Sequence, residues 1–516
     1  MGMLHPLDYA VLAAYLLAVL AICLWTARRH PDADELFLAG RSLGVGVVGL
    51  SLFASNISST TLIGLPGAAW QSGISVANYE WMAALVLVFT AVFVTPVLLG
   101  NRLTTIPELL EKRFDARMRK YLSAVTVFLA LVLDTAGSLY AGAVVMMLFV
   151  PGLSLGLTCG LIAAFTGLYT IAGGLRAVAY SDVLQSIVLL VGSLVLCLLV
   201  FGQYDYQWSQ VAAAVEPDKL SLIRPLDDPA LPWLGTLIGL PVLGFYYWTI
   251  NQYVSQRLLG ARDVGTAGRG AILAAVLKLL PLFLMVIPGV MAIGLFSDLE
   301  RPDSVFPRLV AEYAPAGLAG LILAGLLAAI MSSVDSALNS SATLITLDFI
   351  KPRRPGMDTR SMARLGRYIT LAMVALAALW APAIDRFPGL FAYLQQTFAY
   401  VTPPLVAVFL LGLFGRGVAA RAAFRGTLTG HAISAVWFVA SQLGWLNLHF
   451  TIVAGLLFGL SLLAILGWQA LDRDRAPGAD QLAVVARSRA PAVPVDVRWG
   501  AAVVVVLTVL LVLAFR

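Results

Sequence analysis

Long apolar stretches separated by short polar loops follow one another along almost the whole chain. About 20 apolar residues are enough for a helix to cross the hydrocarbon core of a bilayer. The pattern therefore predicts an all-α polytopic membrane protein with about fourteen transmembrane helices. We expect them near residues 7–27, 45–69, 76–100, 119–150, 153–173, 183–204, 233–255, 268–297, 317–348, 363–384, 389–415, 424–445, 448–471 and 499–515.

The stretch from Ser51 to Trp81 interrupts this pattern, because its sequence SLFASNISSTTLIGLPGAAWQSGISVANYEW is rich in Ser, Thr, Asn and Gly. Hydrocarbon offers no hydrogen-bond partners, so non-helical backbone at membrane depth persists only inside the protein or beside a water-filled cavity. We therefore predict a discontinuous helix that forms a binding site, with Asn56 and Glu80 on either side of the break. The alternative is a glycine-rich helix contact with Glu80 at the level of the headgroups.

Charged and hydroxyl side chains inside other predicted spans also indicate function. Lys278 lies mid-span in AILAAVLKLLPLF, where a cation must face a cavity or an anionic partner, unless it snorkels to the interface. In MSSVDSALNSS, four oxygen-bearing side chains lie within two helical turns and suit a hard cation such as sodium. Hydrogen bonds from the serines to carbonyls one turn earlier are the alternative. The four residues are Ser332, Ser333, Asp335 and Ser336.

Composition and charge exclude several other classes of protein. Of the 516 residues, 60% are hydrophobic and 12% charged, which is outside the range of soluble domains. The net charge of +6 resides in short loops that set topology, so no nucleic acid is expected as a partner. The three cysteines lack the spacing of a zinc site or a disulfide framework. The string Gly44-x-Gly46-x-x-Gly49 matches the dinucleotide-binding fingerprint, but it opens a membrane helix and does not follow a strand. No nucleophile site is recognisable either, so we expect no enzyme.

Basic residues are concentrated in alternate loops, among them residues 28–41, 102–120, 257–269, 351–367 and 473–498. Cytoplasmic loops carry this excess in membrane proteins. With an even number of spans, both termini are then expected outside. We expect a multi-pass protein of the plasma membrane, the inner membrane in a bacterium, that lies in the lipid bilayer as a monomer.

Several rarer motifs carry a family resemblance. The chain contains, in this order, SLFASNISS, YEW, GFYYWTINQYVSQRLLGARD, LKLLPLFLMVIPG, MSSVDSALNSSATL and FAYLQQTFAYVTPPLVAVFLLGLF. Over residues 38–425 it resembles the sodium/solute symporter family, most of all the sodium/glucose cotransporters. The resemblance implies one transport domain (1–516) with a leucine-transporter-type core of two inverted five-helix repeats with discontinuous helices. The repeats would be residues 45–204 and 233–415, with an extra N-terminal helix at 7–27 and extra C-terminal helices at 424–516.

The resemblance pairs the broken helix near Asn56 with a second one around Gly244–Asn251 and places a sugar site between the two. Tyr247 would stack on the pyranose ring as an inner gate. The sequence departs from the family at Thr61, where relatives carry His or Gln, and at Gly244, where relatives carry Asn or Thr. A shorter Thr61 leaves room for a larger or differently oriented polyol. The implied solute-binding residues are Asn56, Thr61, Tyr79, Glu80, Tyr247, Trp248, Lys278 and Gln395.

Sodium is the coupling ion that the resemblance implies. The main site would combine backbone carbonyls and hydroxyls from the first broken helix and the ninth span. Sodium held between these helices and then lost to the cytoplasm would favour inward release of the solute. The implied ligands are the carbonyls of Ala54, Ile57 and Ala329 and the hydroxyls of Ser332 and Ser333.

In relatives that carry two sodium ions, the resemblance places the second beside the first, at positions held here by Asp182, Asp335 and Ser336. Asp335 puts a carboxylate where these relatives have a hydroxyl. Two neighbouring carboxylates repel strongly in a low-dielectric environment, so the site should bind a cation or retain a proton. Pairing of Asp335 with a cytoplasmic arginine such as Arg176 is the alternative.

The expected function is sodium-coupled import of a glucose- or galactose-like monosaccharide by alternating access. A symporter of myo-inositol or of an acidic sugar is the first alternative. The second is a membrane sensor or channel that binds sugar without coupled transport, although a sensor would need a soluble output domain that the sequence does not show.

Overall fold

Ten helices are long and apolar enough to cross a membrane, and two bent helix pairs raise the number to as many as twelve, in the residues that the computed structural model describes. These residues are 4–27, 33–149, 152–299, 301–386, 390–415, 417–472, 477–486 and 491–516. Within them the secondary structure is helical apart from two isolated β-bridges, so the expected all-α architecture is confirmed.

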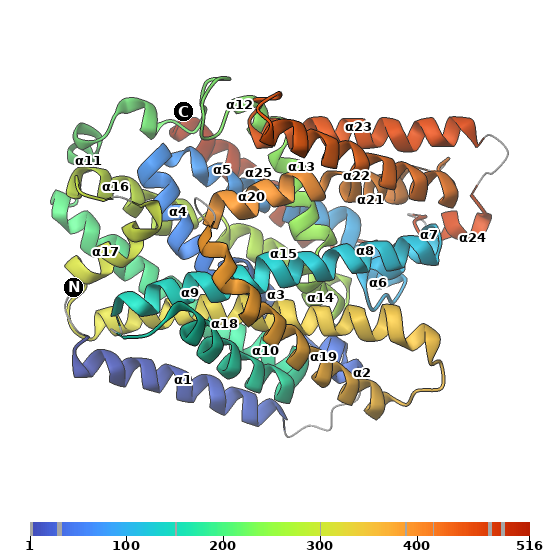
Figure 1. Cartoon of the computed structure of the whole chain (residues 1–516), viewed down its shortest axis with the longest axis horizontal. Helices are drawn as coiled ribbons and strands as arrows, with labels where there is room; N and C mark the ends of the chain where they lie inside the picture. The colour runs from blue at the N-terminus through green and yellow to red at the C-terminus, as the bar shows by residue number, and fades with distance from the viewer. Residues whose placement is uncertain are drawn as a thin grey trace.

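In the first half of the chain, long helices alternate with short ones that lie in predicted loops, such as α2 and α7 (Figure 1). The bounds are α1 (Pro6–Ala27), α2 (Ala33–Leu38), α3 (Val45–Asn56), α4 (Ser59–Ser72), α5 (Asn78–Phe89), α6 (Thr95–Gly100), α7 (Ile106–Arg113), α8 (Ala116–Leu129), α9 (Ala136–Phe149), α10 (Leu155–Phe201) and α11 (Trp208–Ala214).

The second half begins with very short helices and continues with longer ones. The bounds are α12 (Trp233–Ile238), α13 (Leu240–Phe245), α14 (Gln252–Leu259), α15 (Val264–Leu277), α16 (Ile287–Leu295), α17 (Val305–Tyr313), α18 (Leu318–Leu344), α19 (Thr359–Trp380), α20 (Leu390–Val401), α21 (Pro403–Phe414), α22 (Ala420–Gln442), α23 (Phe450–Leu471), α24 (Ala479–Ala483) and α25 (Val495–Ala514).

Two of the fourteen expected spans are helical but lack the length or composition of a complete span. Residues 153–173 include the start of α10, which continues without interruption over 47 residues. The apolar part of that start, Leu155–Leu168, is short for a span. Residues 424–445 lie largely in α22, whose sequence mixes apolar residues with Arg, Thr, Ser and His.

The helix α18 lies deep in the bundle, with 83% of its most apolar window inside the protein. It packs against α10 and α3, and α1 lies along α10 and α18 at the lower edge of the bundle in Figure 1. Small residues along α18 allow this close approach. The hydroxyl and carboxyl groups of α18 are therefore in the interior, where protein groups or bound ions must satisfy them.

The predicted break in the first discontinuous helix lies between α3 and α4, which meet at an angle of 55°. Helical geometry ends at Asn56, and Ile57 and Ser58 have ψ angles of 79° and 171°. The hydroxyl of Ser58 accepts a hydrogen bond from the amide of Thr61 at 3.3 Å and so caps α4. The expectation of a discontinuous helix is thus confirmed.

The second predicted break lies between α13 and α14. A π-helical turn over residues 246–250 follows α13, and Asn251 then adopts an extended conformation with φ −60° and ψ 124°. The Asn251 side chain accepts a hydrogen bond from the amide of Tyr253 at 3.3 Å, which caps the start of α14. Both breaks contribute residues to the wall of one cavity.

Candidate functional site

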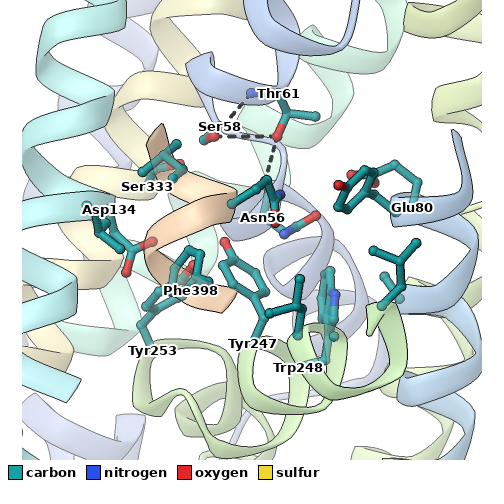
Figure 2. Close-up of a pocket in the computed structure, with 18 of the residues that line it drawn as sticks. Asn56, Ser58, Thr61, Glu80, Asp134, Tyr247, Trp248, Tyr253, Ser333 and Phe398 are labelled. Carbon is teal, nitrogen blue, oxygen red and sulfur yellow. Dashed lines mark hydrogen bonds between the residues drawn. The ribbon is translucent and has the colours of Figure 1, made fainter. Parts of the chain in front are cut away.

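A cavity of about 110 Å³ lies between the two broken helices, α5, α20 and a π-helical turn at residues 130–135 (Figure 2). Its wall combines polar groups with aromatic rings. The lining residues are Asn56, Ser58, Thr61, Tyr79, Glu80, Ala83, Leu133, Asp134, Ser138, Leu240, Leu243, Gly244, Tyr247, Trp248, Tyr253, Ser333, Leu394, Gln395 and Phe398.

The structure brings seven of the eight predicted solute-binding residues to this cavity, and Lys278 is the exception. They come from α3 to α5, the π-helical turn at 246–250 and α20, which are far apart in the sequence. Their role in solute binding stays a prediction. The seven are Asn56, Thr61, Tyr79, Glu80, Tyr247, Trp248 and Gln395.

Lys278 lies behind the cavity wall and is completely buried. Its ammonium group donates hydrogen bonds to the carboxylate of Glu80 and to the side-chain oxygen of Asn56. The ring of Trp248 lies 5.0 Å from the same nitrogen, within the range of a cation–π contact. In this conformation Lys278 therefore holds lining residues in place and neutralises Glu80, so its effect on a solute would be indirect.

Aromatic rings lie on the side of the cavity opposite Thr61 and Ser58 in Figure 2. The ring centroid of Tyr247 lies 5.6 Å from those of Trp248 and Tyr253. These edge-to-face contacts favour a fixed orientation of the rings. A cavity with this wall suits a solute that has both hydroxyl groups and an apolar C–H face.

Thr61 lines the cavity, but its hydroxyl group is engaged within the broken helix. It donates a hydrogen bond to the backbone carbonyl of Asn56 at 3.2 Å (Figure 2). That bond joins the start of α4 to the end of α3 across the break. Thr61 therefore supports the broken backbone as well as bordering the space where a solute would bind.

Asp134 lines the cavity but was not among the predicted site residues. It lies in the π-helical turn at 130–135, between α8 and α9, and its carboxyl group points toward the cavity in Figure 2. Its Oδ2 atom is buried and has no hydrogen-bond partner in the described part of the chain. The signal was present in LVLDTAGS, because a carboxylate within a span indicates function by itself.

The expected sodium ligands at the end of α3 have carbonyl groups that are not used in regular helical bonds. The amide of Ser58 bonds to the carbonyl of Asn56 at 2.8 Å, and not to that of Ala54 as in a continuous helix. Ile57 follows as the C-terminal cap of α3. The last carbonyls of a helix lack intrahelical donors, so those of Ala54 and Ile57 can face a cation.

On α18, which packs against α3, the expected ligands Ala329, Ser332 and Ser333 share one face at helical i, i+3 and i+4 spacing. The hydroxyl of Ser332 donates to Asp182 Oδ1 at 2.5 Å. The hydroxyl of Ser333 is buried, borders the cavity and has no partner among the described residues. An oxygen in that position is available to a cation, as the predicted main sodium site requires.

The residues expected for a second sodium belong to one completely buried group. Asp182 on α10 accepts a hydrogen bond from Ser51 on α3 at 2.5 Å. Ser336 on α18 donates to Asp335 at 3.2 Å. Arg257 on α14 joins them, because its guanidinium lies 3.1 Å from Asp182 Oδ2 and also donates to Ser336. We call Asp182, Arg257, Asp335 and Ser336 the Asp182 cluster.

Two arginines differ from expectation. Arg257 was expected in a cytoplasmic loop that starts at residue 257, whereas it is buried inside the bundle on α14. Arg176, which was the alternative partner of Asp335, forms an ion pair with Glu35 on α2. A buried arginine needs a carboxylate partner, and Asp182 is that partner here. The sequence indicated a special role for Arg257 only through its place in the family motif YVSQRLLGARD.

Comparisons with known proteins show the family of this chain. The family model described as "Sodium:solute symporter family" matches residues 36–430. The chain is 33% identical to sodium/glucose cotransporter 4 of Danio rerio, over 84% of this chain and 72% of that protein. It is 34% identical to a sodium/mannose cotransporter of Bos taurus (84% and 79%). It is also 34% identical to sodium/myo-inositol cotransporter 2 of Sus scrofa (84% and 70%).

Solved structures with a similar fold are those of other transporters. A Na+-coupled sialic acid symporter in a substrate-bound outward-open state has a TM-score of 0.78 at 23% identity, over 92% of this chain and 99% of that chain. MHP1, a nucleobase-cation-symport-1 family transporter, has a TM-score of 0.59 at 17% identity, over 89% and 99%. These likenesses concern the fold, and they confirm the expected leucine-transporter-type architecture.

Proposed function

Because this chain belongs to the sodium:solute symporter family and is a sodium-coupled symporter, we propose that its solute is a glucose- or galactose-like monosaccharide. The observation that carries the proposal is the cavity between the two broken helices, which combines hydrogen-bonding side chains with an aromatic wall (Figure 2). Inverted-repeat transporters bind their substrates at this place. The sugar would be moved inward by alternating access.

The side chains of the cavity match the chemistry of a sugar. The carboxylate of Glu80 can accept hydrogen bonds from hydroxyl groups, and the amides of Asn56 and Gln395 can both donate and accept. Tyr247 offers an aromatic face to the C–H side of a pyranose ring. Lys278 would act by holding Glu80 and Asn56 in their orientation.

Sodium would be coupled to the sugar through the break between α3 and α4. We propose that the ion binds the carbonyls of Ala54, Ile57 and Ala329 and the hydroxyls of Ser332 and Ser333. This site borders the sugar cavity, because Ser333 lines the cavity and Asn56 lies between Ala54 and Ile57 in the chain. An ion that joins α3 to α18 would stabilise the conformation that binds sugar, and its loss would weaken that conformation.

The energy available from one sodium ion is enough for useful accumulation. A membrane potential of about 100 mV supplies about 2.3 kcal/mol per charge, and a roughly tenfold gradient adds about 1.4 kcal/mol. Together they support a sugar gradient of roughly two to three decades. A second sodium in the Asp182 cluster would raise this limit, and it would have to share Asp182 with the guanidinium of Arg257.

A second candidate solute is myo-inositol. The hydroxyl of Thr61 is held by the backbone of Asn56, so this side of the cavity presents a short side chain and leaves space for a cyclitol. Sodium/myo-inositol cotransporter 2 of Sus scrofa is also among the relatives. The two candidates differ in the solute and share the sodium site.

Uptake into proteoliposomes tests the proposed function. Purified protein is reconstituted, and uptake of labelled glucose, galactose, mannose and myo-inositol is measured with an inward sodium gradient or with an equal gradient of choline. We expect accumulation of a hexose above equilibrium with sodium alone. Accumulation of myo-inositol and no hexose would favour the second candidate. Binding without accumulation of any of the four solutes would contradict a symporter of neutral sugars or polyols and favour a sensor.

A further inference from the structure

The acidic and basic side chains that line the cavity are not balanced. Among the described residues of its wall, two carboxylates occur, Glu80 and Asp134, and there is no Lys, Arg or His. Lys278 lies behind Glu80 and forms an ion pair with it. One carboxyl group, that of Asp134, is therefore left without a cationic partner in the wall.

In the part of the chain that the structure describes, the carboxyl group of Asp134 has an unused oxygen atom beside the cavity. Its polar neighbours are the neutral side chains of Asn251 and Tyr253. The Oδ2 atom is buried and has no hydrogen-bond partner in the described residues, and the side chain faces the cavity (Figure 2). A buried oxygen without a partner is rare in proteins, and a bound group that donates a hydrogen bond would satisfy it.

The backbone explains why this side chain points inward. Asp134 lies in the π-helical turn at residues 130–135, between two regular helices. Such a turn inserts one residue into a helix, which redirects the side chains near it, and it is often found at functional sites. The hydroxyl of Thr135 donates to the carbonyl of Ala130 at 2.8 Å and so satisfies a carbonyl of the turn. The turn is thus stabilised by its own residues, and Asp134 is left to face the cavity.

We propose that Asp134 selects solutes by charge. A neutral sugar or polyol would place a hydroxyl donor on its free oxygen, and an amino sugar would place an ammonium group there. A sugar acid would bring a second negative charge beside an unbalanced carboxylate in a cavity lined largely by buried residues, which disfavours its binding. This inference rests on the proposed function, and it removes acidic sugars from the alternatives that the sequence left open.

Competition among sugars of matched shape tests the inference. Uptake of the labelled neutral solute that gives sodium-driven transport is measured with glucose, glucosamine or glucuronate as competitor, and with the corresponding galactose series. The competition is measured at neutral and at mildly alkaline pH, because Asp134 can discriminate by charge only where its carboxyl group is ionised. The variants are Asp134→Asn, which removes the charge with little change in shape, and Asp134→Glu, which keeps the charge. Asp227→Asn, at an exposed position in the loop 205–232, is the matched control.

We expect wild-type protein to be inhibited at least ~10-fold more weakly by the uronate than by the neutral sugar, a difference of about 1.4 kcal/mol. The amino sugar should compete at least as well as the neutral one. Asp134→Asn should lose most of both differences, while Asp134→Glu and Asp227→Asn keep the wild-type order. Thermal unfolding with and without sodium shows whether each variant is folded.

The outcomes separate this inference from the proposed function. Equal inhibition of wild-type protein by uronate and neutral sugar would overturn charge selection, even if Asp134→Asn cannot be purified. Unchanged competition ratios in a folded Asp134→Asn variant would also overturn it. Absence of sodium-driven uptake of every neutral solute would instead refute the proposed function itself.

Discussion

The ion pair between Lys278 and Glu80 joins the wall of the cavity to the helix behind it. Lys278 is completely buried and Glu80 nearly so. Removal of one partner from a buried pair leaves a charge without compensation, which costs about 3–5 kcal/mol, whereas removal of both costs less. The pair therefore links the stability of the bundle to the shape of the solute cavity.

The first prediction concerns this pair. Lys278→Ala should destabilise the protein by about 3–5 kcal/mol and weaken sugar binding, because Glu80 and Asn56 lose their common donor. Lys278→Met keeps most of the side-chain volume but not the charge and serves as the matched comparison. The double variant Glu80→Gln/Lys278→Met should regain part of the stability and bind sugar poorly. Thermal unfolding and equilibrium sugar binding measure the two effects, and additive losses in the double variant would contradict the coupling.

The second prediction concerns Ser333 on α18. Ser333→Ala should raise the sodium concentration for half-maximal uptake by roughly tenfold, because a charge-assisted contact is lost that corresponds to about 1.4 kcal/mol. By linkage, sodium should then increase the affinity for sugar less than in the wild type.

Ser340→Ala is the matched control, because Ser340 is also buried on α18 but bonds to the backbone carbonyl of Ala337. Sodium titrations of sugar uptake and binding compare the two variants. An unchanged sodium dependence in Ser333→Ala would show that its hydroxyl is not a sodium ligand.

At the scale of the elements, four helices meet at the Asp182 cluster. Asp182 lies on α10, Arg257 on α14 and Ser336 on α18, and Ser51 of α3 hydrogen-bonds to both Asp182 and Arg257. The cluster therefore joins the first broken helix to the second. Its charge balance bears on the number of coupled ions, because it contains two carboxyl groups and one guanidinium.

The third prediction concerns a second sodium ion in this cluster. Two ions should give a Hill coefficient for sodium above one and two charges moved per sugar in reversal-potential measurements on proteoliposomes at fixed pH. Asp335→Ala should lower the Hill coefficient toward one while sugar binding persists, and Asp227→Ala should change neither. One charge per sugar in the parent protein would refute the two-sodium proposal.

At the scale of the whole molecule, the two ends of the bundle differ. Figure 1 shows the N- and C-terminal labels and α11 toward one end and α2, α7 and α24 toward the other. The second end includes several of the loops in which basic residues are concentrated. By the positive-inside rule we expect this end to face the cytoplasm.

The fourth prediction tests this orientation. In a variant without Cys23, Cys159 and Cys197, single cysteines are placed at two exposed positions, Asp227→Cys and Gly356→Cys. A membrane-impermeant maleimide should label Asp227→Cys in intact cells and Gly356→Cys only after permeabilisation. Both variants should retain sodium-driven uptake, which controls for correct folding. The opposite labelling pattern would reverse the proposed topology.

The sequence by itself determined the features that depend on local composition. Apolar runs predicted the helices because a bilayer has one thickness and no hydrogen-bond partners, and polar residues around Asn56 predicted the broken helix for the same reason. The ordered motifs indicated the family, which the match over residues 36–430 shows. Seven of the eight solute-binding candidates then met at one cavity.

The tertiary structure decided which charged groups are partners. Lys278 and Glu80 are 198 positions apart and Arg257 and Asp182 are 75 apart, so no local pattern could pair them. An arginine near the end of a predicted span is expected in a loop. Arg257 is nevertheless buried in the helix bundle, because its carboxylate partner lies on another helix. Asp134 was overlooked because its importance arises from what it faces, a cavity whose described wall residues include no cation. Burial is largely a property of a segment, whereas electrostatic compensation is a property of residues that only the fold brings together.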